Sequence, residues 1–231
     1  MRLSVIIPVY NEEQTIHEVL VRVAAVDLGP TELEIVVVND GSTDGTRPVI
    51  DEGSLPRDLR MHVYHSPINL GKGAAVRLGL AFATGDVLLV QDADLELDPG
   101  EYVQLLEPIR AGRADVVYGS RFLAPTAKVP LKARAANRFL TLLTNVLFAG
   151  RLTDMETAYK VMRRDALDGI RLRCVGFDIE PELTARLLRA GRRIVEVPIS
   201  YNPRRIEEGK KMRWIDGVDA IYTLFKCRFT R

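Results

Sequence analysis

Two aspartates separated by one residue are the feature of this sequence best suited to chemistry. Asp92 and Asp94 follow the apolar run 87–90, which has the character of a buried strand. If the strand continues to the aspartates, their side chains share one face and lie about 7 Å apart. A small bend would let both carboxylates face one divalent cation, which prefers hard oxygen ligands. Taken alone, the same run is also typical of an acidic turn.

Polar or glycine-rich segments follow other predicted strands and favour the metal interpretation. Singly, each also fits a turn or a helix cap. In a parallel sheet, however, the carboxyl ends of the strands meet at one edge, so we expect these segments to face a shared crevice. The segments are 8–13 (PVYNEE), 39–45 (NDGSTDG), 69–73 (NLGKG) and 92–96 (DADLE).

The arrangement of predicted elements supports this placement. Strand patterns at 3–8, 33–40, 61–65, 87–92 and 115–120 alternate with helical patterns at 12–26, from about 43, and at 73–83 and 99–111. Such alternation predicts βαβ crossovers and a mostly parallel sheet. After residue 121 the rhythm changes, and the expected elements are helices at 131–149 and 179–190, a strand at 193–198 and a basic amphipathic helix within 210–231.

Charge divides the 231 residues into two unlike halves. Residues 1–120 hold 9 Lys and Arg against 19 Asp and Glu, whereas residues 121–231 hold 23 against 12. The split favours an acidic half that holds cations and a basic half that meets an anion or an anionic membrane. The alternative is charge that only solvates the surface.

Other global features point to a reduced chain outside the secretory route. Cys174 and Cys227 lie far apart and form no metal or redox spacing. The first residues enter a strand pattern at once, so we expect no signal peptide. No apolar run approaches the roughly 20 residues needed to span a bilayer.

In combination, the motifs resemble the inverting family 2 glycosyltransferases, and the resemblance covers essentially the whole chain. Gly119-Ser120-Arg121 and the basic second half make the sequence most similar to the dolichol- and polyprenyl-phosphate sugar (mannose) synthases. The resemblance implies an α/β GT-A fold with a mostly parallel, Rossmann-like sheet. Residues 1–120 would be the donor and metal-binding half of one catalytic domain. Residues 121–231 would be its acceptor and membrane-interface half, with amphipathic helices. The motifs that carry the resemblance are 4–12 (SVIIPVYNE), 38–44 (VNDGSTD), 69–73 (NLGKG) and 92–94 (DAD).

The resemblance also implies roles on the donor side. Asp92 and Asp94 would hold Mg²⁺ or Mn²⁺, and Glu96 would lie near the ion, where the family often has glutamine. The segment 207–211 (EEGKK) departs from the family's Gly-Glu-Ser-Lys-like pattern. The residues matched to nucleotide-sugar contacts are Pro8, Tyr10, Asn11, Glu12, Asp40, Ser42, Gly71, Lys72, Ala93 and either Arg204 or Arg205.

On the acceptor side, the resemblance implies that Arg121, with Arg134 or Arg138, holds a phosphate. A lipid monophosphate is mostly ionised at pH 7 and needs no general base. A sugar hydroxyl would need one, and Asp154 and Asp178 are the candidates.

The sequence therefore predicts transfer of a hexose from GDP-mannose or a UDP-hexose to a polyprenyl or dolichyl monophosphate, with inversion. One alternative is a family 2 enzyme acting on a soluble or glycan hydroxyl, and another is an inactive nucleotide-binding subunit. We expect peripheral attachment to the inner face of the cell membrane from the cytoplasm, with a possible membrane-anchoring partner protein and no nucleic acid. The apolar residues expected at the membrane are Phe139, Leu142, Leu143, Val146 and Leu147 in one helix, and Trp214, Ile215, Val218, Ile221, Tyr222 and Phe225 in the tail.

Overall fold

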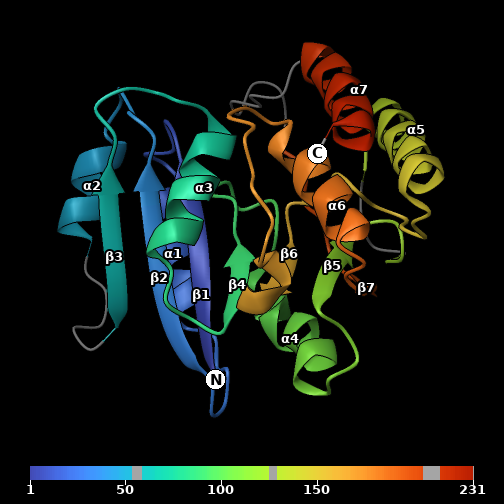
Figure 1. Cartoon of the computed structure of the whole chain (residues 1–231). Helices are drawn as coiled ribbons and strands as arrows, with labels where there is room; N and C mark the ends of the chain where they lie inside the picture. Colours follow the sequence, from blue (N-terminus) through green and yellow to red (C-terminus); the bar gives the residue numbers. More distant parts are fainter. Residues whose placement is uncertain (54–58, 125–128, 205–213, 231) are drawn as a thin grey trace.

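A single seven-stranded sheet organises the chain, in the order β3-β2-β1-β4-β6-β5-β7 (Figure 1). This computed structural model describes residues 1–53, 59–124, 129–204 and 214–230. Every pairing is parallel except those of β6, so the predicted mostly parallel sheet is confirmed. The strands are β1 (Arg2–Val9), β2 (Glu32–Asn39), β3 (Arg60–His65), β4 (Val87–Val90), β5 (Val116–Ser120), β6 (Lys160–Arg163) and β7 (Ile194–Pro198).

Strand β6 is absent from the elements expected from the sequence. It has only four residues and begins and ends with a basic side chain, so it carries no clear strand pattern. Tertiary pairing creates it, because it inserts antiparallel between β4 and β5, with Met162 opposite both Leu88 and Val116. The insertion separates β5 from β4 and brings residues of the second half next to the Asp92 strand.

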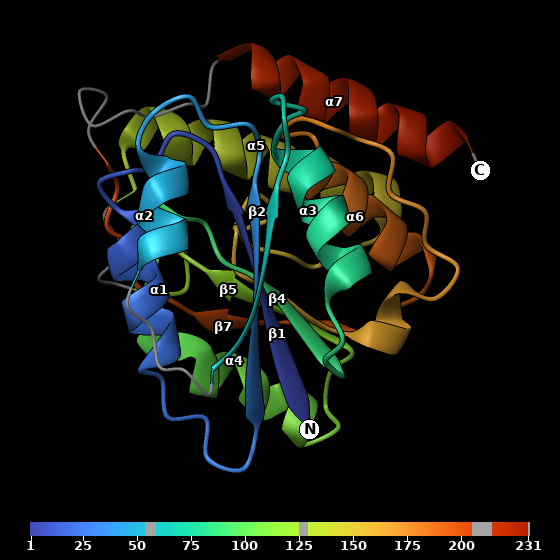
Figure 2. The same cartoon turned by 90° about the vertical axis from the view of Figure 1, so that its left-hand side faces the viewer.

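Helices cover both faces of the sheet (Figure 2). Side chains of β1 alternate between the two layers, as the strand period requires: Leu3, Val5 and Ile7 enter one hydrophobic cluster and Ile6 the other. The first cluster includes side chains of α1 (Ile16–Ala24), α2 (Thr46–Glu52) and α4 (Tyr102–Arg110), which directly follows the 3₁₀ turn η1 (Pro99–Glu101). The second includes side chains of α3 (Lys72–Phe82), α5 (Leu131–Phe148), the 3₁₀ turn η2 (Arg164–Leu167), α6 (Ile179–Arg189) and α7 (Trp214–Phe229).

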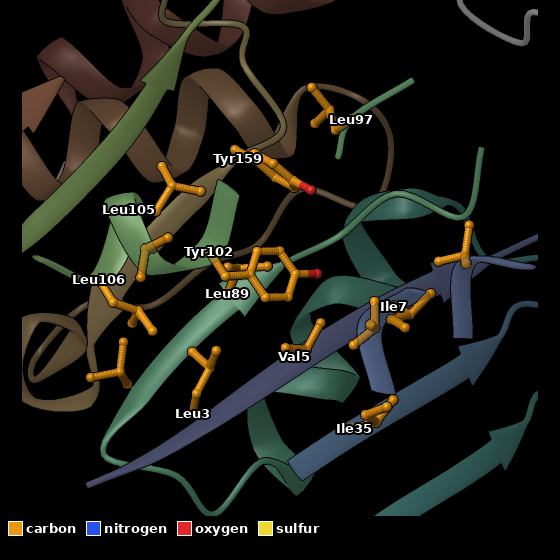
Figure 3. Packing of buried hydrophobic residues seen from close by; sticks show 14 of the residues in the cluster. Leu3, Val5, Ile7, Ile35, Leu89, Leu97, Tyr102, Leu105, Leu106 and Tyr159 are labelled. Carbon is orange, nitrogen blue, oxygen red and sulfur yellow. The ribbon is translucent and has the colours of Figure 1, made fainter. Parts of the chain in front are cut away.

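The core reaches the base of the aspartate loop through two buried tyrosines. Tyr102 and Tyr159 lie among the aliphatic side chains of β1 and β4 (Figure 3). Their hydroxyls both donate to Oε1 of Gln91, each at 2.7 Å. The Gln91 side-chain amide in turn donates to the carbonyl of Asp92 at 2.9 Å. Packing of the core therefore fixes the backbone from which the two aspartates project.

Two element boundaries next to the aspartate loop differ from expectation. Strand β4 ends at Val90, so Asp92 and Asp94 lie in the loop after it rather than on one strand face. Helix α1 begins at Ile16 instead of residue 12, and the Thr15 hydroxyl before it donates to the carbonyl of Ala93 at 2.7 Å. Among the described residues, no helix is long and apolar enough to cross a membrane.

Candidate active site

The loops that follow β1, β2 and β4 meet at one edge of the sheet, as predicted. The backbone amide of Asn11 donates to the Ser42 hydroxyl at 2.9 Å, and the amide of Thr43 donates to the Asn11 side chain at 2.8 Å. Asn11 has a left-handed backbone, with φ of 49°, which asparagine tolerates better than most residues. These hydrogen bonds hold the first two loops together as one unit.

Asp40 shapes the loop that carries Lys72. It is 4% exposed, and its two carboxylate oxygens accept from the backbone amides of Leu70 and Gly71, at 2.9 and 2.7 Å. Gly71 has φ of 99°, and a Cβ there would lie 2.4 Å from the Val175 carbonyl oxygen. The loop therefore needs glycine at this position, both for its backbone and for its close approach to Val175. Lys72 follows as the first residue of α3.

The two aspartates occupy different surroundings within their loop. Asp92 pairs with Lys72, whose Nζ lies 2.8 Å from Oδ1. Asp94 accepts the backbone amide of Glu96 at 3.1 Å. Leu95, between Asp94 and Glu96 in the sequence, has a left-handed backbone with φ of 61°. This conformation is rare for a bulky residue and occurs most often at functional sites.

Three carboxylates lie close together around Asp94, and this concentration of negative charge favours binding of a cation. Burial, together with the charges of Asp92 and Glu96, raises the pKa of Asp94 to about 7. Glu96 is already engaged, because Oε1 accepts the backbone amide of Arg204 at 2.8 Å and Oε2 accepts the Tyr201 hydroxyl at 2.9 Å. The metal role expected of Glu96 stays a prediction.

The carboxylates fit a divalent cation that takes its other ligands from a substrate or water. In the part of the chain that the structure describes, no group of three or more His, Cys, Asp or Glu side chains could hold a metal ion. Mg²⁺ commonly binds through one or two carboxylates together with substrate phosphates. Asp92 and Asp94 suit such a site. The described residues do not provide a full set of protein ligands for a metal ion.

Arg204 reaches this loop from the segment after β7. Its Nε donates to the Asp94 carbonyl at 2.8 Å, and its Nη2 lies 2.7 Å from the Glu12 carboxylate. Arg204 thus lies beside both the β1 loop and the aspartate loop. The other tail candidate, Arg205, and the 207–211 segment lie outside the described residues.

Arg121 is not a free cation, because Asp154 holds it. Nε and Nη2 of Arg121 each lie 2.8 Å from a carboxylate oxygen of Asp154, and Asn137 of α5 donates to the same carboxylate at 2.8 Å. Asp154 is completely buried. Burial alone would raise its pKa, but the hydrogen bonds and charge of Arg121 hold that pKa below its usual value. Asp154 is therefore a fixed counter-ion, poorly placed to act as a general base.

The remaining acceptor-side candidates lie in two different surroundings. Arg134 and Arg138 are exposed on α5 and lie over the ring of Phe122, at 5.7 and 6.0 Å from its centroid. The Asp178 carboxylate accepts the Thr223 hydroxyl of α7 at 3.1 Å. Which of these residues contacts a substrate stays a prediction.

Sequence reasoning did not predict how the buried charges behind the site pair with one another. Glu180 of α6 lies between two lysines, with an oxygen 3.3 Å from Lys72 Nζ and a hydrogen bond from Lys160. One carboxylate oxygen of Glu156 is buried without a hydrogen-bond partner, and burial, opposed in part by Lys160, raises the pKa of Glu156 to about 7. The only sequence signal was that Glu156, Lys160 and Glu180 stand close to apolar residues in the segments 155–162 and 179–188.

Tyr201, also missed, links the two halves of the site. Its hydroxyl donates to Glu96, and the guanidinium of Arg121 lies over its ring, 5.1 Å from the centroid. The aspartate loop and the Arg121–Asp154 pair are therefore neighbours in the folded chain.

Comparison with known proteins identifies the family. Residues 4–171 match the profile described as glycosyl transferase family 2. The chain is also 34% identical to undecaprenyl-phosphate mannosyltransferase of Micrococcus luteus, over 94% of this chain and 90% of that protein. The chain belongs to glycosyl transferase family 2. The sequence resemblance is thereby confirmed.

Other relatives set limits on what the match covers. This chain is 31% identical to glycosyltransferase AglD of Haloferax volcanii. The match covers 88% of this chain but only 34% of AglD. Glucosyl-3-phosphoglycerate synthase of Mycobacterium tuberculosis, solved with Mn²⁺, UDP and phosphoglyceric acid, superimposes with a TM-score of 0.73 at 21% identity. The superposition covers 100% of this chain and 79% of that one, and it confirms the predicted GT-A fold.

Proposed function

We propose that this glycosyl transferase moves a hexose from a nucleotide sugar to a polyprenyl monophosphate, with inversion at the anomeric carbon. An oxygen of the acceptor phosphate attacks the anomeric carbon, and the bond from that carbon to the donor diphosphate breaks. The electron pair of the broken bond stays on the leaving oxygen of the nucleoside diphosphate. The similarity to undecaprenyl-phosphate mannosyltransferase supports this acceptor class.

The observation that carries the proposal is the engagement of Asp154 by Arg121. A hydroxyl acceptor requires a carboxylate free to take its proton, and Asp154 gives both oxygens to Arg121 and Asn137. An acceptor phosphate arrives ionised and needs only orientation by planar guanidinium groups. Arg121 of the pair, together with Arg134 or Arg138, is proposed to provide that orientation.

On the donor side, Asp92 and Asp94 would hold Mg²⁺ or Mn²⁺. The metal, when bound, supplies positive charge for the leaving diphosphate. Lys72 and Arg204 lie beside the two aspartates and would add to that stabilisation. The end of β1 and the loops after β1, β2, β3 and β4 would hold the nucleoside. The residues proposed for these contacts are Pro8, Tyr10, Asn11, Glu12, Asp40, Ser42, Gly71 and Ala93.

One observation favours the alternative of a hydroxyl acceptor. Glu156 has an unpaired carboxylate oxygen and a pKa of about 7, the properties of a general base. If it acts so, Glu156→Gln abolishes transfer to a hydroxyl. Transfer to a lipid phosphate, by contrast, would survive that substitution.

Helices α5 and α7 supply a surface for meeting the lipid. The two helices pack against each other (Figures 1 and 2), and each keeps an exposed apolar stripe. Leu143, Leu147 and Ile221 of the expected stripes instead pack on the core. We propose that the exposed stripes and nearby basic side chains lie on the inner face of the cell membrane, with or without an anchoring partner protein. The exposed apolar residues are Leu131, Phe139, Leu142 and Val146 of α5, and Ile215, Val218, Tyr222, Phe225 and Phe229 of α7.

A donor and acceptor panel tests the proposed reaction. GDP-mannose and UDP-hexoses are each incubated with Mn²⁺ and either undecaprenyl phosphate or a glycan hydroxyl acceptor. The expected product is a glycosyl undecaprenyl phosphate from at least one donor. Transfer to the hydroxyl acceptor alone would overturn the proposal.

A matched substitution tests the metal motif in the same assay. Asp94→Asn is expected to abolish turnover while leaving the circular dichroism spectrum unchanged. Asp27→Asn, in the exposed loop between α1 and β2, is the control and should retain full activity. Normal activity of the Asp94 variant would contradict its role.

A further inference from the structure

The first aspartate of the motif is already neutralised by a lysine of the same chain. Nζ of Lys72 lies 2.8 Å from Oδ1 of Asp92 and 3.1 Å from Oδ2, so one ammonium faces both carboxylate oxygens. The side chains of Lys72 and Asp92 are 15% and 24% exposed. A contact so sheltered from water is much stronger than a surface ion pair.

Glu180 provides a second anchor for the same ammonium. Its Oε1 lies 3.3 Å from Lys72 Nζ, so the ammonium contacts the carboxylates of both Asp92 and Glu180. Glu180 is itself held by Lys160, which is completely buried and also donates to the Thr157 carbonyl. Asp92, Lys72, Glu180 and Lys160 thus form a row of alternating charges that runs from the aspartate loop into the second half of the chain.

This row conflicts with a divalent cation on Asp92. A metal bound to either oxygen would approach the Lys72 ammonium within a few ångströms, where like charges repel strongly. The described residues also offer the metal too few ligands without a substrate, since they contain no group of three metal-binding side chains. A diphosphate would remove both obstacles, because its oxygens can ligate the metal and also accept the ammonium.

We propose that Lys72 is an internal counter-ion that occupies Asp92 in the free protein and passes to the donor diphosphate when the metal takes its place. Glu180 is the positioning residue that keeps the ammonium beside the site during this exchange. The inference rests on the proposed function, because it requires a nucleoside diphosphate at the aspartate loop. It predicts that metal and nucleotide bind cooperatively, each strengthening the other by the same factor.

Titration of Mn²⁺ followed by electron paramagnetic resonance tests the exchange without any turnover. The wild-type protein should bind Mn²⁺ at least tenfold more tightly with saturating GDP or UDP than without, after correction for the metal–nucleotide complex in a protein-free sample. Lys72→Met removes the competing ammonium, so it should bind Mn²⁺ alone at least fivefold more tightly than wild type. Its gain on adding nucleotide should be smaller than that of wild type, and the remaining gain comes from the phosphate oxygens that ligate the metal.

The outcomes separate this inference from the proposed function. Equal Mn²⁺ affinity of wild type and Lys72→Met without nucleotide, alongside nucleotide-dependent binding in the wild type, overturns the exchange alone. Absence of Mn²⁺ binding to either protein, even with both nucleotides tested, overturns the proposed metal-dependent function and the exchange with it.

A second pair of variants tests Glu180. Glu180→Gln leaves the displaced ammonium without its second carboxylate, so Mn²⁺ alone should bind at least threefold more weakly than to wild type. Glu182→Gln is the matched control, because Glu182 is also buried on α6 but bonds to Arg173, Cys174 and Arg186. Equal effects of the two substitutions would contradict the positioning role. If loss of the Lys160 partner unfolds Glu180→Gln, the Lys72→Met titration decides the proposal by itself.

Discussion

The guanidinium of Arg121 and the carboxylate of Asp154 form a two-point ion pair inside the protein, with two nitrogen–oxygen distances of 2.8 Å. The Asp154 side chain is fully buried and that of Arg121 is 14% exposed. Breaking a buried pair leaves one charge without compensation, which costs far more than losing a surface pair. The pair therefore serves the fold as well as the proposed acceptor site.

Asp154→Asn is expected to lower the free energy of unfolding by about 3 kcal/mol at pH 7. Urea denaturation followed by circular dichroism measures the change. Asp165→Asn is the control, because Asp165 pairs with Arg163 at the surface and both side chains are about half exposed. The control should change stability by less than about 1 kcal/mol. A similar decrease in the free energy of unfolding in both variants would show that the buried Arg121–Asp154 pair stabilises the fold no more than a surface pair does.

The same substitution should also change the acid limb of the stability curve. The pKa of Asp154 is lower in the folded protein than in the unfolded chain, despite burial, because of Arg121. Its stabilisation is therefore complete above the unfolded pKa and is lost as pH falls through the folded pKa. The stability difference between wild type and Asp154→Asn should stay nearly constant from pH 5 to about pH 4 and shrink as the pH is lowered further toward pH 3. A constant difference would contradict the depressed pKa.

Glu156 should show the opposite pH dependence. Burial raises its pKa from 4.5 to about 7, so between these values the folded protein binds more protons than the unfolded chain. Stability then falls as pH rises through this window, because the buried carboxyl must ionise. Glu156→Gln should stabilise the protein by about 3 kcal/mol at pH 8 and change it little at pH 4.5. An equal effect at both pH values, measured by urea denaturation, would disprove the shift.

Gly71→Ala should weaken nucleotide binding by displacing the loop that carries Lys72. The added Cβ would lie 2.4 Å from the Val175 carbonyl oxygen, so the loop or the 174–176 segment must move. Gly112→Ala is a matched control, because Gly112 also has a left-handed backbone but no atom within 4 Å of the added Cβ. Both variants should lose about 1 kcal/mol of stability from backbone strain. Only Gly71→Ala should also lose at least tenfold in GDP or UDP affinity by calorimetry.

Charge placed on the exposed stripe of α7 should reduce membrane binding. Tyr222 and Phe225 are 65% and 42% exposed, so replacing both by Glu should leave the fold intact. Co-sedimentation with anionic vesicles at low salt is expected to fall at least fivefold. Val103→Glu is the control, since Val103 is 44% exposed on α4, across the sheet. Wild-type protein that fails to sediment with the vesicles would refute the membrane proposal itself.

The alternating strands and helices of residues 1–120 were predictable, because their hydrophobic periods differ and glycine and polar residues separate them. The meeting of the loops after β1, β2 and β4 followed from that alternation, since parallel strands place their carboxyl ends together. Asp92 and Asp94 could thus be assigned to the site before their surroundings were known. Their exact backbone could not, because the strand ends at Val90 and Leu95 takes a left-handed conformation.

The sequence by itself determined the layered α/β architecture and the edge where polar loops gather, since both depend on local periodicity and on strand direction. Only the tertiary structure decided which charges are paired. Lys72 meets Asp92 and Glu180, and Arg121 meets Asp154, across segments that are distant in sequence. The short strand β6 and the tyrosines on Gln91 likewise exist through contacts with other elements. Such pairings depend on distance and burial in the folded chain, and no local pattern encodes either quantity.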